Sequence, residues 1–160
     1  MHLYFDIETN GLLETTDRIH SLVIQDAETG KVTSCTDNSP NYASIQTGLD
    51  MLTEAEAIIG HNIICFDIPV LQKLFDFNPK GQIIDTLTIS RLLYTNLADL
   101  DFARSRSGKP FHLPKQLYGR HSLEAWGYRL SEQKDTFGHT TDWQTWTPEM
   151  QTYCEQDVKV

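Results

Sequence analysis

Residues 3–12 read LYFDIETNGL, and this stretch indicates the kind of fold to expect. Its first five residues have the short apolar character of a buried strand. Side chains two positions apart on a strand point to the same side, so Asp6 and Glu8 project together at its carboxyl end. Burying two like charges costs several kcal/mol unless a cation compensates, which makes a metal ion the simplest account of the pair. A solvated strand end leading into the turn at 9–11 explains this segment alone equally well.

A second acidic position follows the apolar segment 57–60, which predicts another short strand. The apolar spacing after it predicts a helix that ends near Phe75 and has Asp67 near its start. The helix dipole alone favours an aspartate there. Likewise, hydrogen bonds to the local backbone are sufficient to explain His61 and Asn62, which lie between strand and helix.

The last segment supplies a third acidic position. Residues 147–149, Thr-Pro-Glu, have the character of an N-cap and a first helical turn, so we expect a helix running toward Val160. Tyr153 and Asp157 are four residues apart and therefore share a face of that helix. A phenol and a carboxylate can then reach one site together, although a packing role with a solvated hydroxyl also explains Tyr153.

The rest of the pattern predicts a single α/β domain over residues 1–160. The further expected strands are 18–25, 31–36 and 82–84, with the first two joined in a hairpin by the turn at 26–30. The further expected helices are 42–52, with Ile45, Leu49 and Leu52 inward, and 86–94, with Leu87, Ile89, Leu92 and Leu93 inward. Antiparallel strands followed by alternating helices and strands predict a mixed central sheet flanked by helices.

Composition sets outer bounds on function. A chain of 160 residues with 39% hydrophobic content fits one soluble domain with its own core. We find no stretch with the character of a membrane span or a secretion signal. The three cysteines are widely separated and form no C-x-x-C, which is typical of a reducing cytosol. The six histidines show no spacing of a zinc site.

The net charge of −9 argues against nucleic-acid binding, but the distribution of charge weakens that objection. Five of the thirteen Lys and Arg residues lie within 102–120, where there is no acid: Arg104, Arg106, Lys109, Lys115 and Arg120. Glycines and prolines interrupt this segment, so one interpretation is a solvated loop. An equally good interpretation is a basic, mobile loop beside the site that guides a DNA strand, with Arg104, Arg106 and Lys109 as contacts.

Taken together, D-x-E at 6–8, H-N-x4-D at 61–67 and Y-x3-D at 153–157 resemble the three exonuclease motifs of the DEDD superfamily, in the branch with tyrosine in the third motif. More narrowly, the chain resembles the proofreading domain of family A DNA polymerases of T-odd phages. That resemblance rests on IDTL at 84–87, SRL at 90–92, SGK at 107–109 and HSLEAWGYRL at 121–130. It covers nearly the whole chain and is weakest in 26–55 and 135–147. It implies the ribonuclease-H-like exonuclease fold.

The resemblance also implies the chemistry. It implies a 3′–5′ exonuclease that releases nucleoside 5′-monophosphates from single-stranded or mismatched DNA by a two-metal-ion mechanism, with two Mg²⁺ or Mn²⁺ ions. The implied metal ligands are Asp6, Glu8, Asp67 and Asp157. In the implied arrangement, Asp6 bridges both ions and Asp67 acts on the second ion largely through water. Tyr153 is implied to orient the attacking water. The implied contacts to the substrate are Thr9, Gly11, Leu12 and Asn62.

The same resemblance implies a larger assembly. We expect residues 1–160 to be a single exonuclease domain, excised from or ending before a C-terminal polymerase domain. The implied partners are frayed DNA 3′ ends, the polymerase domain in cis and other replisome proteins, with no membrane. We expect a monomer in the cytoplasm, that of the bacterial host if a phage encodes the chain.

Two other functions stay open. A 3′–5′ RNA-processing exonuclease uses the same set of side chains, and only contacts sensitive to the 2′-hydroxyl separate RNA from DNA. The block Ala-Trp-Gly-Tyr at 125–128 favours DNA through the phage resemblance. The other alternative is a catalytically silent module that only binds single strands, and the presence of all five chemical residues argues against it.

Overall fold

The computed structural model describes residues 1–132 and 142–160, so part of the stretch 135–147 lies outside the described residues. Its centre is a five-stranded sheet in the order β3-β2-β1-β4-β5. The strands are β1 (His2–Thr9), β2 (Ile19–Asp26), β3 (Val32–Cys35), β4 (Ala57–Gly60) and β5 (Gln82–Asp85). Antiparallel pairing joins β1, β2 and β3, whereas β1, β4 and β5 pair in parallel. The predicted mixed sheet and its hairpin are confirmed.

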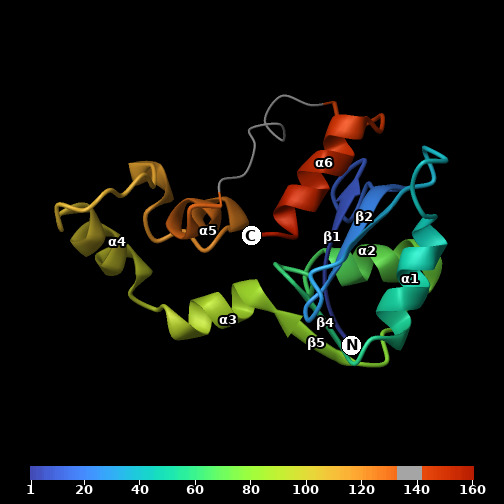
Figure 1. The fold of residues 1–160 in the computed structure, drawn as a ribbon, viewed down its shortest axis with the longest axis horizontal. Coiled ribbons are helices and arrows are strands. Elements are labelled where there is room, and N and C mark those ends of the chain that lie inside the picture. Colours follow the sequence, from blue (N-terminus) through green and yellow to red (C-terminus); the bar gives the residue numbers. More distant parts are fainter. Residues whose placement is uncertain (133–141) are drawn as a thin grey trace.

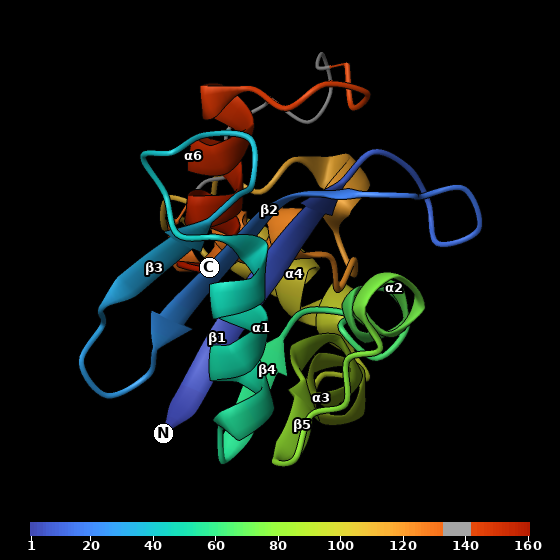
Figure 2. The ribbon, with the colours of Figure 1, turned by 90° about the vertical axis from the view of Figure 1, so that its right-hand side faces the viewer.

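The helices lie on both faces of this sheet and beyond it. They are α1 (Ile45–Glu54), α2 (Asp67–Phe75), α3 (Thr86–Leu93), α4 (Leu97–Ser105), α5 (Leu123–Leu130) and α6 (Pro148–Asp157), with a 3-10 turn η1 at Lys115–Leu117. In Figure 1, β1 and β2 lie between α1 and α6. Figure 2 shows α1 crossing in front of the sheet. No helix in the described ranges is both long and apolar enough to cross a membrane.

The core forms on the face of the sheet that α1 and α2 cover. Alternate residues of β1, namely Leu3, Phe5 and Ile7, are buried there. The predicted inward residues of α1 (Ile45, Leu49 and Leu52) belong to the same cluster, as do Val70 and Leu71 of α2. The other residues of β1 therefore face the side of the sheet on which α6 lies, because successive side chains of a strand alternate.

The ends of α1 and α3 differ from the prediction by one to three residues. Helix α1 begins at Ile45 rather than at 42, because the Ser44 hydroxyl accepts a hydrogen bond from the Thr47 amide at 3.2 Å and caps the helix there. Helix α6 begins as predicted, after the Thr147 cap, and runs toward Val160 as far as Asp157.

Helices α3, α4 and α5 and the loops between them form an arm, residues 86–130, that extends away from the sheet (Figure 1). The predicted inward face of α3 is wrong. Leu92 and Leu93 are 72% and 70% exposed and Ile89 is 42% exposed, whereas the only buried residue of the helix is Ser90. The reason is that the Ser90 hydroxyl is hydrogen-bonded to His121 Nδ1 at 2.7 Å and accepts from Trp126 Nε1 at 2.9 Å. The polar side of α3 therefore faces α5 and the residues just before it.

A buried ion pair also holds the arm together. The Arg129 guanidinium donates to both carboxylate oxygens of Asp101, at 3.0 and 2.7 Å, and both side chains are almost fully buried. Asp101 accepts a further bond from the Gly119 amide at 2.8 Å. Part of the segment 102–120, predicted as a loop, is therefore ordered by α4, η1 and these contacts.

Candidate metal centre

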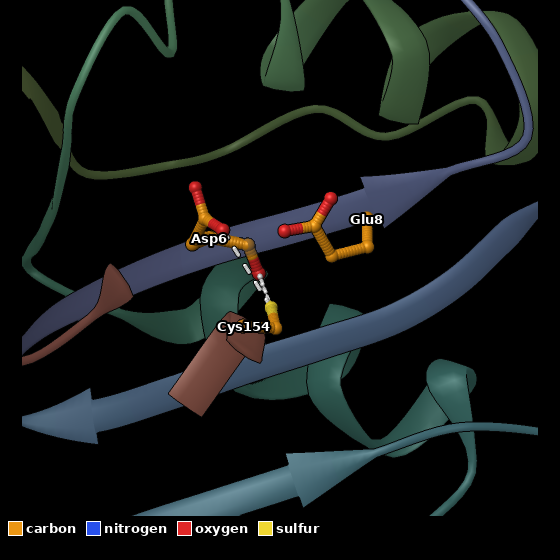
Figure 3. Close-up of side chains that lie close together, drawn as sticks. All are labelled: Asp6, Glu8 and Cys154. Carbon is orange, nitrogen blue, oxygen red and sulfur yellow. Dashed lines mark hydrogen bonds between the residues drawn. The ribbon is translucent and has the colours of Figure 1, made fainter. Parts of the chain in front are cut away.

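The acidic pair of β1 faces α6. Asp6 and Glu8 are both half-buried and lie on the opposite face of the strand from Phe5 and Ile7. Figure 3 shows their carboxylates beside the thiol of Cys154, which comes from α6. Ligand atoms of these three residues all lie within 4.8 Å of one another. The predicted convergence of Asp6 and Glu8 on one site therefore holds, and carboxylate oxygens at this spacing suit one divalent cation.

Cys154 is a member of this cluster that the sequence analysis missed. Its thiol is fully buried and donates to the Asp6 carbonyl at 3.5 Å and to Asp6 Oδ2 at 3.6 Å. Burial raises the pKa of this thiol well above its ordinary value, and the charges of Asp6, Glu8 and Asp157 raise it further. The thiol therefore stays protonated. Its position three residues before Asp157, on the same helix face, is the signal that would have found it.

Asp157 is the last residue of α6, the helix that also carries Cys154. It is buried, and together with Asp6 it lines a cavity of about 400 Å³. The cavity lies between the open face of the sheet, at Tyr4 and Ile59, and α5, at Trp126. The structure thus brings Asp6 and Asp157, 151 positions apart in the chain, to the wall of one cavity.

Asp67, the first residue of α2, lies against the strand that carries the acidic pair. It is 4% exposed, and its Oδ1 has no hydrogen-bond partner among the described residues. Burial raises the pKa of Asp67 to about 7; its own amide and that of Ile7 act against the rise, and the charge of Asp85 adds to it. Ile7 lies between Asp6 and Glu8 in the sequence, so Asp67 adjoins their strand. A buried carboxyl with an unused oxygen fits a hard divalent cation.

The turn before Asp67 is held by Asp85, a second residue that the sequence analysis did not assign a role. The Asp85 carboxylate accepts from the amides of Asn62 at 3.3 Å and Ile64 at 3.0 Å, and it caps α3 by accepting from Thr88 at 3.1 Å. Asn62 has a positive φ of 68°. Gly60 begins the turn, where a Cβ atom would lie 2.7 Å from the Phe5 carbonyl oxygen, so only glycine lets the turn approach β1 this closely.

The two remaining residues of the motifs have structural partners. His61 Nδ1 lies 2.9 Å from the Thr86 hydroxyl. The Tyr153 ring packs edge-on against the Trp143 ring, with 6.3 Å between the ring centroids. This contact agrees with a packing role for the ring of Tyr153, and a role of its hydroxyl in orienting water stays a prediction.

The loop after β1 presents one of the expected substrate residues to solvent. Leu12 is 72% exposed, which excludes the core role that a leucine ordinarily has. The Thr9 hydroxyl donates to the Gly11 carbonyl at 2.7 Å and so shapes the start of this loop. Thr9, Gly11 and Leu12 follow Glu8 directly in the sequence, so the loop begins at the acidic pair.

Helix α4 and the loop after it, which carry the three basic residues predicted to contact DNA, lie away from β1 and α6 (Figure 1). Figure 1 shows α4, which contains Arg104, at the far end of the arm from β1 and α6. The Arg104 guanidinium lies 5.1 Å from the centre of the Phe111 ring, and that of Arg106 lies 5.9 Å from the Phe102 ring. Lys109 is exposed in the loop that follows. A contact of these three residues with DNA stays a prediction.

Comparisons with known proteins place this chain in a family. A model of the RNase H superfamily matches residues 3–159. The chain is 36% identical to the DNA-directed DNA polymerase of Escherichia phage T7 over 184 residues, and 36% identical to that of Enterobacteria phage T3 over 190 residues. These alignments cover 97% and 99% of this chain but 25% of each polymerase. The chain therefore spans about a quarter of the length of these relatives.

Solved structures of other nucleases share the fold. Brucella melitensis NrnC has a TM-score of 0.62 at 18% identity, with 98% of this chain and 66% of that chain covered. Escherichia coli RNase D, an exoribonuclease involved in structured RNA processing, has a TM-score of 0.58 at 15% identity, with 98% and 35% covered. At such low identity the likeness extends to the fold alone.

Proposed function

This chain belongs to the RNase H superfamily, and from that premise we propose that it is a metal-dependent 3′–5′ exonuclease domain that proofreads DNA 3′ ends for a phage-type DNA polymerase. The observation that carries the proposal is the grouping of carboxylates around the end of β1. Asp6 and Glu8 share one face of β1, and Asp157 lines a cavity with Asp6. Asp67 lies against β1 at Ile7, the residue between Asp6 and Glu8. The similarity to two phage DNA polymerases supports DNA as the substrate.

The carboxylates would hold two divalent ions, Mg²⁺ or Mn²⁺. When bound, such ions supply an activated water and stabilise a developing negative charge on a leaving oxygen. Asp6, with Glu8 and Asp157, would hold the first ion, and Asp67 would serve the second through its unused oxygen. These residues repel one another when ionised, so neutralisation by cations explains how they can lie together partly out of water.

The proposed reaction is hydrolysis of the last phosphodiester bond. The oxygen of water forms a bond to phosphorus, the bond from phosphorus to the 3′ oxygen of the preceding nucleotide breaks, and that oxygen takes a proton. The products are a nucleoside 5′-monophosphate and a shortened strand with a free 3′-hydroxyl. Tyr153 would orient the attacking water through its hydroxyl.

The substrate would enter past the loop that follows β1. An exposed leucine at position 12 is suited to contact unstacked bases, and Thr9 and Gly11 would lie along the terminal nucleotide. Asn62 would support the second motif or contact the substrate backbone. Base stacking and backbone contacts make such a site tolerant of sequence. It favours frayed or mismatched ends, because separating a matched duplex costs a few kcal/mol.

The partners of the domain follow from its relatives. Because those relatives are DNA polymerases about four times as long as the aligned region, we propose a polymerase domain in cis as the source of the 3′ end. We further propose that the exonuclease domain is a monomer in the bacterial host cytoplasm. Other replisome proteins would act through the polymerase.

The test is digestion of a DNA primer with a mismatched 3′ end, beside RNA of the same sequence, with Mg²⁺ and with EDTA. We expect release of nucleoside 5′-monophosphates from DNA only with the metal, and none from the Asp6→Ala variant. Preferential digestion of RNA would instead favour an RNA-processing exonuclease. Retained binding without turnover in Mg²⁺ would favour a silent single-strand-binding module.

A further inference from the structure

A lysine of α2 reaches across to the loop between β1 and β2. The Lys73 ammonium donates to three main-chain carbonyls, those of Leu13 at 2.9 Å, Glu14 at 3.2 Å and Thr16 at 2.8 Å. An ammonium has three donors, so all of them are used on one short turn. These partners are 57 to 60 positions away in the sequence, so the contact is a tertiary one.

The turn that Lys73 binds is the one that presents Leu12. The Leu12 carbonyl accepts hydrogen bonds from the amides of Thr15 at 2.9 Å and Thr16 at 2.7 Å, which closes the turn from inside. The carbonyls that follow, at 13, 14 and 16, are the ones that meet the ammonium. Lys73 therefore fixes the base of the turn while the Leu12 side chain stays in solvent.

A second residue braces the loop elsewhere. The Asn10 side-chain oxygen accepts from the Thr16 hydroxyl at 3.0 Å and from the amides of Asp17 at 3.2 Å and Arg18 at 3.3 Å. These bonds order the return of the chain toward β2. They do not involve the carbonyls of residues 13 and 14. The turn is therefore tied to the body by the Lys73 ammonium at these carbonyls and by the packing of the Leu13 side chain against the core.

Helix α2 joins this tie to the metal centre. It begins with Asp67, the buried carboxyl that lies against β1, and Lys73 is in its last turn. A helix of nine residues is a rigid spacer, so one element carries both a metal-facing carboxyl and the support of the substrate loop. Helix α2 therefore links the position of the Leu12 turn to that of Asp67.

We propose that Lys73 is a positioning residue that holds the Leu12 turn in place to receive the unpaired 3′ end of the DNA. This inference rests on the exonuclease function proposed above. Lys73 takes no part in the chemistry, because its donors are occupied by main-chain carbonyls. Its loss should weaken capture of the strand and leave the bond-breaking step nearly unchanged.

The experiment compares Lys73→Met with Lys80→Met. Lys80 is a matched control, an exposed lysine whose ammonium pairs with Glu54 at 2.5 Å. Amide hydrogen exchange of Thr15 and Thr16, followed by NMR, reports the turn without any substrate. Steady-state trimming of single-stranded DNA gives KM and kcat separately.

We expect Lys73→Met to speed exchange of these two amides by about ten-fold or more, since hydrogen bonds from a charged donor to the turn are lost. KM should rise about ten-fold while kcat stays within about two-fold, and Lys80→Met should change none of these values. Lys73→Arg, which keeps the charge, should have a KM between those of the wild type and Lys73→Met.

Two results would overturn the inference. Unchanged exchange at Thr15 and Thr16 in Lys73→Met would mean that the turn does not depend on the lysine. A fall in kcat with unchanged KM would place Lys73 in the chemical step instead. A wild-type protein that trims no DNA would refute the proposed function and the substrate part of this inference. The exchange measurement would still decide whether Lys73 orders the turn, so the two failures are distinguishable.

Discussion

The sheet body and the arm are stabilised in different ways. The body buries a continuous apolar cluster between β1 and the helices α1 and α2, with Leu3, Phe5 and Leu52 almost fully buried. The arm leaves Leu92 and Leu93 in solvent and is held by a buried ion pair and by hydrogen bonds of Ser90. Of the carboxylates of the candidate metal centre, Asp6 and Glu8 lie on the face of β1 that the apolar cluster does not occupy, whereas Asp67 begins α2 on the other face. The comparison teaches that the body depends on apolar packing, whereas the arm depends on buried polar contacts.

The largest expected effect separates chemistry from packing. Asp6→Ala should lower the rate of mononucleotide release by about a thousand-fold or more, because it removes a carboxylate that would hold the catalytic ion. In the absence of metal, the melting temperature of this variant should be equal to that of the wild type or slightly higher, because a repulsive charge is removed. Tyr153→Phe should retain weak activity. Equal activity of the two variants would refute these roles.

The ion pair of the arm is the next test. Arg129→Met leaves the Asp101 carboxylate buried without its guanidinium, and such a loss costs about 3–5 kcal/mol. Urea denaturation followed by circular dichroism measures it. The double variant Asp101→Leu with Arg129→Met should lose less, because no buried charge remains. A single variant as stable as the wild type would show that the arm does not depend on this pair.

Leucines in the two regions give a matched pair of truncations. Leu52→Ala, in the fully buried core of the body, should lower the free energy of unfolding by about 2–5 kcal/mol. Leu92→Ala, on the exposed face of α3, should change it by no more than about 0.5 kcal/mol. Similar losses at both positions, measured in the same urea titration, would contradict the difference between body and arm.

The pH dependence of stability tests the burial of Asp67. Its pKa is raised to about 7 in the folded protein, against about 3.9 for an unperturbed aspartate, so folding favours the protonated form. Its contribution to stability is therefore complete below the unfolded pKa and is lost as the pH rises through 7. In EDTA, Asp67→Asn should be more stable than the wild type at pH 8, with the difference shrinking toward pH 4.5.

The control for this titration is Asp76→Asn, at the exposed opposite end of α2. Its free energy of unfolding should stay parallel to that of the wild type over the same pH range. A difference between wild type and Asp67→Asn that does not vary with pH would mean that Asp67 does not carry a buried charge above neutrality.

The smallest expected effect concerns the basic residues of the arm. If Arg104 and Arg106 each contact a phosphate, replacing both by alanine should reduce the salt slope of single-strand binding by roughly 1 to 1.5. The paired control, Lys31→Ala with Lys80→Ala, removes the same charge from exposed positions outside the arm. An unchanged slope in the arm variant would assign 102–120 to structure alone.

Sequence patterns predicted the body better than the arm for a physical reason. Alternation in β1 and the apolar spacing of Ile45, Leu49 and Leu52 reflect burial against a single large core, which periodicity detects directly. The pattern of α3 is equally apolar, but periodicity does not say whether a partner covers the face, and Ser90 turned inward instead. The predicted inward set on α3 therefore failed although the helix itself was correct.

The same limit applies at the site. The D-x-E pair and the Tyr153 to Asp157 spacing show which side chains share a face, so Asp6, Glu8 and Asp157 were predictable. The spacing of Cys154 to Asp157 indicates a shared helix face, but the partners of Cys154 and Lys73 are 148 and about 60 positions away, and local spacing does not identify them. Asp85 was given no role, because its bonds to the turn at 62–64 depend on the parallel pairing of β4 with β5.

The alternation of β1 has a consequence for how this chain can change during evolution. One face of the strand contributes Leu3, Phe5 and Ile7 to the core. The other face contributes Asp6 and Glu8 to the candidate metal centre, so neighbouring residues of one strand belong to the core and to the site. Inserting or deleting one residue ahead of Asp6 would exchange the two faces at once, burying charge and exposing the apolar set. Substitution can alter the core or the site separately, but the length of this strand is constrained by both together.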